Sequence, residues 1–239
     1  MYLKITATGP QAEQIGQLLG RFPEKLLIRE PPNAQLRLIV EASLPGSISF
    51  TMLAYPEPAT GWDVPPDQLQ IVDYVKARAV ALSPLFRSFL DGAFGSALAP
   101  IARSELVRRK FELQAEIAPL EVSFRNPNVK GLFEPLGYHV ELESPVFGLS
   151  AILLRLLGRQ SLTDVIRHLF VLVPALDEAK QAPLNTEEAK RLSTLSLPWL
   201  ASHPKRGVVA RSYRLKLAQL IGPPAAARAN TALARRAGT

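Results

Sequence analysis

The chain has 239 residues, of which 47% are hydrophobic, so it can form one large domain or two small domains packed together. It contains no cysteine, which excludes disulfides and thiolate metal sites and leads us to expect a cytoplasmic protein. The longest apolar tracts are interrupted by charge within about ten residues, so no membrane span and no membrane partner are predicted.

The positive charge is concentrated near the C-terminus. The net charge is +7, yet ten Lys and Arg residues and no acidic residue follow Glu188. Such an asymmetry predicts a polyanion or an acidic protein surface as the partner of this end. A solvated helix face followed by a loose tail is the alternative that the sequence leaves open.

The N-terminal half begins with strands and continues with predicted helices. Leu3–Thr8 alternates as a strand that Gly9-Pro10 ends, and residues 11–19 form a short amphipathic pattern. Leu36–Ala42 and Ile48–Tyr55 are expected to pair as a hairpin through residues 44–47. A proline-rich loop is predicted over residues 56–66. Helices are predicted over residues 68–84, 85–99 and 100–113. On the outer side of the last helix we expect Arg108, Arg109 and Lys110.

The second half predicts three strands, the last two of them paired, and a helical end. The expected strands are 117–124, Tyr138–Glu143 and Leu149–Leu157, with helical turns over 129–136 before Gly137. Ser161 and Asp164 have the spacing of a capping box and mark the start of the clearest helix. Its inward stripe is predicted to be Leu162, Val165, Ile166, Leu169, Phe170 and Val173. Pro174 is expected to open a further turn, and helices are predicted from Asn185 and over Val208–Ile221.

These elements lack a regular βαβ rhythm, so the predicted fold class is α+β, with mixed or antiparallel sheets and a helical C-terminal part. One domain is expected over residues 1–221, and a division into subdomains of about 1–125 and 126–221 is left open. Residues 222–239 are rich in Ala and Arg and are predicted to be a flexible basic tail.

The chain lacks the sequence motifs of several classes of enzyme. It has neither a Lys-x-Asp-Gly nucleotidyltransferase frame nor a Walker A loop, nor a Gly-x-Gly-x-x-Gly turn for a nucleotide or methyl donor. No cofactor, no metal site and no catalytic residue is therefore expected, and the chain is predicted not to be an enzyme. A zinc site would require convergence of the three scattered histidines His139, His168 and His203 with distant ligands.

Two of these histidines and the aromatic residues have simpler interpretations. His168 is expected on a helix flank, bonded to or paired with Asp164 four residues earlier, and His203 before Pro204 is expected to close a helix end. The aromatic residues sit among aliphatic ones, so core positions are predicted rather than stacking platforms; they are Phe124, Phe133, Tyr138, Phe147 and Phe170. Only Tyr213 interleaves with the basic end.

Three long tracts resemble a known family. They are Leu132-Phe133-Glu134-Pro135-Leu136-Gly137-Tyr138, residues 161–180 with His168-Leu169-Phe170-Val171-Leu172-Val173-Pro174, and Trp199-Leu200-Ala201-Ser202-His203-Pro204. In this order and spacing they resemble the N-terminal domain of the bacterial HEN-type RNA 3′-terminal ribose 2′-O-methyltransferase. The resemblance spans about residues 1–221.

The resemblance implies a division of labour. In that family the C-terminal half carries the methyltransferase, and the N-terminal half binds and activates the ligase module of a polynucleotide kinase-phosphatase-ligase that repairs RNA. The present chain is expected to lack the methyltransferase half, either as a separate subunit that works beside a methyltransferase subunit or as a shortened form. Lys76, Arg78, Asp177 and Lys180 lie in or beside the matched tracts and are the predicted contacts with the ligase.

The sequence departs from the family after Val75, where Lys76-Ala77-Arg78 replaces a polar stretch, and after Lys180, where Gln181-Ala182-Pro183 stands. If these segments touch the ligase, activation is affected. Two other functions therefore remain: a structural subunit that has lost activation, or RNA binding through residues 205–216 and 228–236. The predicted RNA-binding residues are Lys205, Arg206, Arg211, Arg214 and Lys216.

Overall fold

The computed structural model describes residues 2–18, 25–28, 34–56, 90, 93–94, 105–122, 128–143, 151–176, 186–215 and 220. Several predictions lie outside these residues: the loop after Pro56, most of the helical pattern over 68–99, the four ligase contacts Lys76, Arg78, Asp177 and Lys180, and Lys216 and the tail. The division of the chain into domains stays a prediction.

The described strands form one antiparallel sheet of seven strands in the order β2-β3-β4-β1-β5-β7-β6. Together with the helices it confirms the α+β class. The strands are β1 (Tyr2–Thr8), β2 (Lys25–Ile28), β3 (Ala34–Leu44), β4 (Ser47–Pro56), β5 (Lys110–Glu121), β6 (His139–Glu143) and β7 (Ala151–Ser161).

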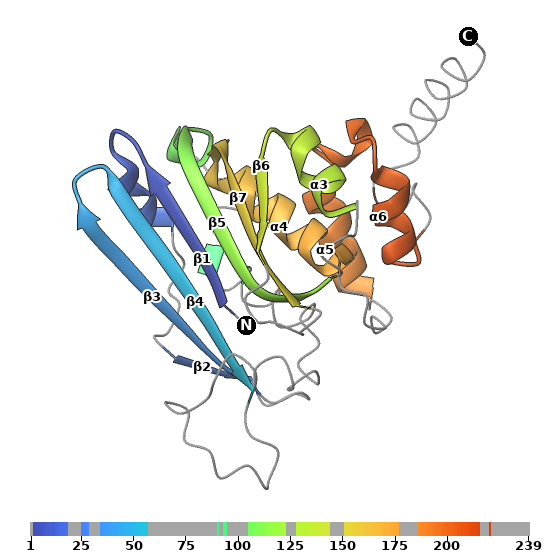
Figure 1. Ribbon diagram of the computed structural model, residues 1–239, viewed down its shortest axis with the longest axis horizontal. Helices are drawn as coiled ribbons and strands as arrows, with labels where there is room; N and C mark the ends of the chain where they lie inside the picture. Colours follow the sequence, from blue (N-terminus) through green and yellow to red (C-terminus); the bar gives the residue numbers. More distant parts are fainter. Residues whose placement is uncertain are drawn as a thin grey trace, which may run out of the picture.

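The main helices cover one face of this sheet (Figure 1). Alternate residues of the central strands, such as Ile5, Phe50 and Leu154, are fully buried on that face. The helices are η1 (Ala12–Leu18), η3 (Glu105–Val107), α3 (Asn128–Phe133), η4 (Glu134–Leu136), α4 (Leu162–Leu176), α5 (Thr186–Ser196), η5 (Leu200–Ser202) and α6 (Arg206–Ser212). Burial of the apolar strand face beneath the helices is the main source of stability.

The first predicted strands and their hairpin are confirmed. β1 pairs with β4 on one side and β5 on the other, and β3 pairs with β4 through the turn at Gly46. Gly9 and Gly46 have φ of +132° and +76°, which glycine adopts without steric cost. The Gly9 N–H donates to the Gly46 carbonyl at 2.9 Å, so the end of β1 is tied to the hairpin.

The helix predicted over residues 100–113 is wrong where the structure describes it. Residues 105–107 form one 3-10 turn, and Lys110 begins the twelve-residue strand β5. Phe111, Leu113, Ala115 and Ile117 are buried at alternate positions, a period of two that only a strand satisfies. Arg108, Arg109 and Lys110 are exposed, as predicted, but at the entry to a strand.

Helix α4 is the central element of the helical layer. Its start is confirmed, because the Ser161 Oγ accepts the Asp164 N–H at 3.1 Å and donates to the Asp164 carboxylate at 2.7 Å. The predicted apolar stripe is buried, but burial extends around the helix to Val171, Leu172 and Pro174. Pro174 lies inside α4 and does not open a separate turn, because α4 continues to Leu176.

The last predicted helix is shorter than the sequence pattern indicated. α6 ends at Ser212, although the apolar pattern suggested one helix over 208–221. The Leu215 N–H donates to the Ala210 carbonyl at 3.0 Å and the Arg214 N–H to the Arg211 carbonyl at 2.9 Å. These are the bonds of a Schellman motif, and they require a left-handed residue, here Arg214 with φ of +52°.

Two glycines give opposite predictions for the same substitution. A Cβ at Gly158 of β7 would lie 2.9 Å from the Gly137 carbonyl oxygen, whereas a Cβ at Gly207 of α6 meets nothing within 4 Å. We expect Gly158→Ala to lower the free energy of unfolding by about 1–3 kcal/mol through overpacking. Gly207→Ala should raise it by about 0.5–1 kcal/mol through helix propensity. Urea unfolding of both variants checks this, and equal effects would contradict the close approach at Gly158.

Candidate interaction surfaces

The three tracts that carry the family resemblance meet in one cluster of mostly buried side chains, which we call the aromatic–histidine junction. It consists of Phe133 and Tyr138 from the first tract, His168 from α4, and Trp199 and His203 from the third tract. Consecutive rings in this order pack edge to face, with centroids 4.8–6.1 Å apart. Edge-to-face packing of this kind adds to the stability that burial provides. The junction therefore fixes η5 and α6 onto α4 and the α3 region.

His168 lies inside this junction rather than on a helix flank. The Tyr138 hydroxyl and His168 Nδ1 share a hydrogen bond of 2.8 Å, so the hydrogen-bond partner at Nδ1 is Tyr138, while the predicted partner Asp164 acts on the ring through its charge. Asp164 also caps α4 with Ser161. Burial lowers the pKa of His168 to about 4 and raises the pKa of Tyr138 above its ordinary value, so at neutral pH both groups are uncharged.

His203 ends a helical turn, as predicted, and also binds a second element. Its N–H donates to the Leu200 carbonyl at 3.1 Å, which closes η5. The Lys205 N–H donates to Nδ1 at 3.1 Å, so the ring proton lies on Nε2 and is donated to the Leu132 carbonyl at 3.0 Å. Burial lowers the pKa of His203, which favours this neutral form.

Four of the predicted RNA-binding residues lie on or beside α6, and we call them the α6 basic surface: Lys205, Arg206, Arg211 and Arg214. Lys205 and Arg206 stand half-buried at the start of the helix, and Arg211 and Arg214 are exposed at its end. Tyr213, the aromatic residue among them, is buried, and its hydroxyl donates to the Val171 carbonyl at 2.6 Å. The structure thus brings the four cations to one element and removes Tyr213 as a stacking platform.

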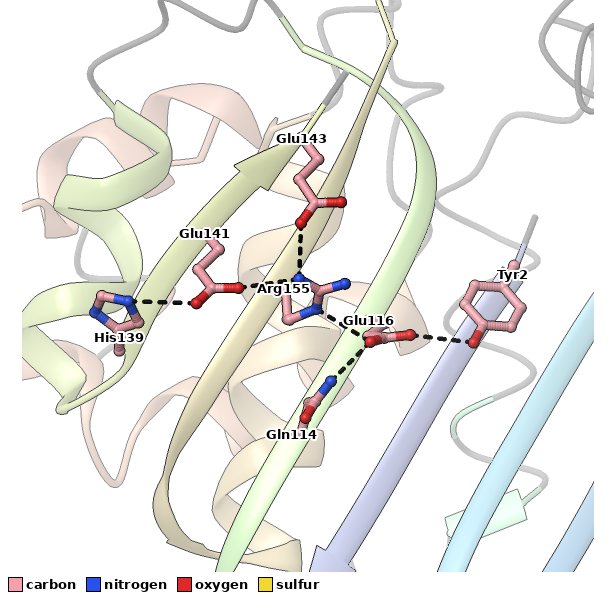
Figure 2. A network of polar contacts seen from close by, with 7 residues as sticks. All are labelled: Tyr2, Gln114, Glu116, His139, Glu141, Glu143 and Arg155. Atoms are coloured by element: carbon pink, nitrogen blue, oxygen red, sulfur yellow. Dashed lines mark hydrogen bonds and ion pairs between the residues drawn. The ribbon is translucent and has the colours of Figure 1, made fainter. Parts of the chain in front are cut away.

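A second surface is the sheet face opposite the helices, which we call the open sheet face. Cross-strand pairing aligns Lys4 of β1, Glu116 of β5, Arg155 of β7 and Glu141 of β6 in one row. Figure 2 shows the side chains of Tyr2, Glu116, Arg155 and Glu141 in sequence across these strands. These four side chains project on the same side of the sheet because each strand alternates its faces.

Arg155 is the centre of this row. Its Nε donates to Glu116 at 3.1 Å, and its Nη1 donates to Glu141 at 3.0 Å and to Glu143 at 2.8 Å (Figure 2). One cation thus faces three carboxylates, which leaves a local excess of negative charge. His139, two residues before Glu141 in the outer strand β6, lies with its Nε2 3.5 Å from the Glu141 carboxylate.

Glu116 remains ionised despite its partial burial. Burial acts to raise its pKa, but hydrogen bonds from Arg155, Gln114 and Tyr2 outweigh this, so the pKa lies below its usual value. Burial and the adjacent Glu116 carboxylate raise the pKa of Tyr2 to about 12, so the phenol keeps its proton and donates to Glu116 at 3.2 Å. The charged groups of this network are thus held in place by hydrogen bonds to one another.

Arg155 and Arg159 make a matched pair for testing the network. Both lie in β7 on the open sheet face, but Arg159 is 74% exposed and is paired, among the described residues, with Glu112 alone at 4.0 Å, whereas Arg155 is 26% exposed. We expect Arg155→Met to cost about 1–2 kcal/mol of unfolding free energy at low salt, since three carboxylates lose their cation. Arg159→Met should cost under about 0.5 kcal/mol. Chemical unfolding at two salt concentrations measures the loss of unfolding free energy for both variants. Similar losses would contradict a stabilising role of Arg155 in the network.

Sequence reasoning found the α6 basic surface but missed the Arg155 network. The signal was present as Glu141 and Glu143 two residues apart in one strand and Arg155 in the strand expected to pair with it. Pairing alone did not give the register that sets Arg155 opposite Glu141.

Among the residues that the structure describes, no three His, Asp or Glu side chains converge as a metal site. None of the described helices combines the length and apolar character needed to cross a bilayer.

These features define the class: an α+β domain in which the described helices cover one side of the sheet that the described strands form and leave the other side open, with a basic helical end. The model of a family described as the RNA repair, ligase-Pnkp-associating region of Hen1 matches residues 1–228. The chain belongs to this family. The comparison with curated proteins finds no match.

Proposed function

We propose that this chain is a non-catalytic activator that binds the ligase module of Pnkp during RNA repair. The observation that supports it most is the match of residues 1–228 to the ligase-Pnkp-associating region of Hen1. The proposal assigns ligation to the partner, and it assigns no methyl transfer to these 239 residues, which lack a glycine-rich turn for a methyl donor. It also places the protein in the cytoplasm, in keeping with the absence of cysteine.

Activation by binding requires a difference in affinity between two ligase conformations. A partner shifts a conformational equilibrium only by its differential affinity for the two states. An adenylylation-competent state populated at about 1% becomes dominant if the activator binds it about 10⁴-fold more tightly than the other state. A rigid binding surface favours such discrimination, because little ordering free energy is lost on binding.

The open sheet face is a rigid surface of this kind. Its central side chains are held by the hydrogen bonds of Arg155 and Glu116, and its strands are paired on both sides from β3 to β7. The proposal also includes a second group of contacts with the ligase, which were predicted from the sequence: Lys76, Arg78, Asp177 and Lys180.

Sedimentation of mixtures of the chain and the ligase module at micromolar concentration tests the binding. We expect a stoichiometric complex that survives gel filtration. Arg78→Glu and Asp177→Lys reverse charge at two predicted contacts, and Lys190→Glu in α5 serves as a charge-reversed control. Weaker binding by the first two variants but not by the control supports the predicted contacts, and no complex with the unaltered chain would end the proposal.

A further inference from the structure

We propose that the α6 basic surface is a binding site for the phosphodiester backbone of single-stranded RNA. The inference goes beyond ligase binding, since it gives the chain a direct contact with the molecule under repair. Figure 1 shows α6 at the edge of the domain beyond β6, on the helical side and away from the open sheet face. RNA bound there would not occupy the open sheet face.

Two of the four cations are oriented by side-chain bonds to the backbone. The Arg206 Nη1 donates to the His203 carbonyl at 3.2 Å, and the Arg211 Nε donates to the Gly207 carbonyl at 3.3 Å. Each of these bonds uses one of the five N–H donors of its guanidinium. The stem of Lys205 lies against α3, where a Cβ at Gly131 would be 3.1 Å from its Cε. The aromatic–histidine junction beneath holds α6 in place through His203.

Arg214 provides an observation that is independent of charge. It adopts φ of +52° at the end of α6, in the position where glycine is the usual residue. A non-glycine residue in this left-handed region costs roughly 1 kcal/mol. The conformation places an arginine side chain, exposed, one turn beyond Arg211. The helix end requires a left-handed residue here, and the sequence supplies an arginine in place of the less strained glycine.

Three of the four cations, Lys205, Arg211 and Arg214, have no acidic partner among the residues that the structure describes. No Asp or Glu follows Glu188 in the sequence. Among the described residues, the ion pairs of the structure lie on the sheet and at the start of α4, and none involves Lys205, Arg211 or Arg214. A concentrated cationic field of this kind attracts a polyanion.

Recognition through this surface is expected to ignore base sequence. Tyr213 is buried against α4 and is not available for stacking, so the contacts that remain are those of cations with phosphates. Each phosphate neutralised on a single strand adds about 0.7 to the slope of log affinity against log salt. Four contacts then predict that affinity falls about 50-fold between 50 and 200 mM KCl.

The test measures fluorescence anisotropy of a labelled single-stranded RNA of about twenty nucleotides with the full chain, in the absence of ligase. The double variant Arg211→Gln/Arg214→Gly leaves two contacts, so we expect weaker binding at 50 mM KCl and a fall of only about sevenfold up to 200 mM. The control Arg108→Gln/Lys110→Gln removes the same charge at the start of β5 and should behave as the unaltered chain.

Arg214→Gly alone separates binding from folding. Glycine relieves the left-handed strain, so this variant should melt at the same temperature as the unaltered chain or higher, while its salt slope falls by about 0.7. The proposal is overturned if the unaltered chain shows no salt-dependent RNA binding, or if the double variant and the control bind RNA alike. It is also overturned if the double variant keeps its RNA affinity and loses the ligase instead, since the surface would then bind protein.

Discussion

Replacing Phe133 by alanine is expected to lower the free energy of unfolding by about 3–5 kcal/mol. The Phe133 ring is fully buried and packs edge to face on Tyr138, with centroids 6.1 Å apart, at the start of the aromatic–histidine junction. Its loss removes apolar burial and leaves a cavity between α3 and the junction that the surrounding backbone cannot close. Urea or thermal unfolding followed by circular dichroism measures the change.

Leu197→Ala is the matched control for this substitution, because Leu197 is 50% exposed at the end of α5 and should cost under about 0.5 kcal/mol. A loss below about 1 kcal/mol for Phe133→Ala would contradict the buried junction. Since His203 of the junction binds the Leu132 carbonyl beside Phe133, the variant should also loosen η5 and α6. Faster amide hydrogen exchange in residues 200–213 would report this.

Acidification should destabilise the protein through His168. Its folded-state pKa of about 4 lies below the ordinary value of 6.5, so between these values the unfolded chain binds a proton that the folded protein excludes. The stabilisation by the neutral imidazole is complete above pH 6.5 and is lost as the pH falls toward 4. Between pH 7 and pH 5 this group alone should remove about 2 kcal/mol of unfolding free energy.

Comparison of pH profiles isolates this effect from other titrating groups. His168→Gln keeps a polar group beside Tyr138 but cannot be protonated, so its stability should change about 2 kcal/mol less between pH 7 and pH 5. His139→Gln makes the same substitution at an exposed histidine of β6 and serves as the matched control. If the three proteins show the same pH dependence, His168 is not buried in its neutral form.

The sequence predicted those elements in which local pattern and tertiary environment agree. Alternation identified β1 and the β3–β4 hairpin, and the capping residues Ser161 and Asp164 located the start of α4. Residues 100–113 failed because short apolar runs beside Arg108 and Arg109 fit a helix face as well as a strand entry. The alternation that decides for β5 becomes clear only from Phe111 onward.

The residues of the candidate surfaces and of the junction likewise differ in whether the sequence could predict them. The cations of the α6 basic surface could be found, because charge asymmetry is a property of the sequence itself. The partner of His168 could not, since Tyr138 lies thirty residues earlier, just before β6, and only the tertiary fold brings it onto α4. The end of α6 was missed because an arginine, rather than a glycine, holds the left-handed position that stops the helix.

Adenylylation of the Pnkp ligase module, measured while the chain is titrated into it, tests directly whether this protein acts by binding and not by chemistry of its own. We expect the rate to rise and to saturate at one chain per ligase, while the chain alone seals no RNA and transfers no methyl group. An unchanged adenylylation rate at micromolar chain, or a covalent nucleotide on the chain itself, would contradict this function.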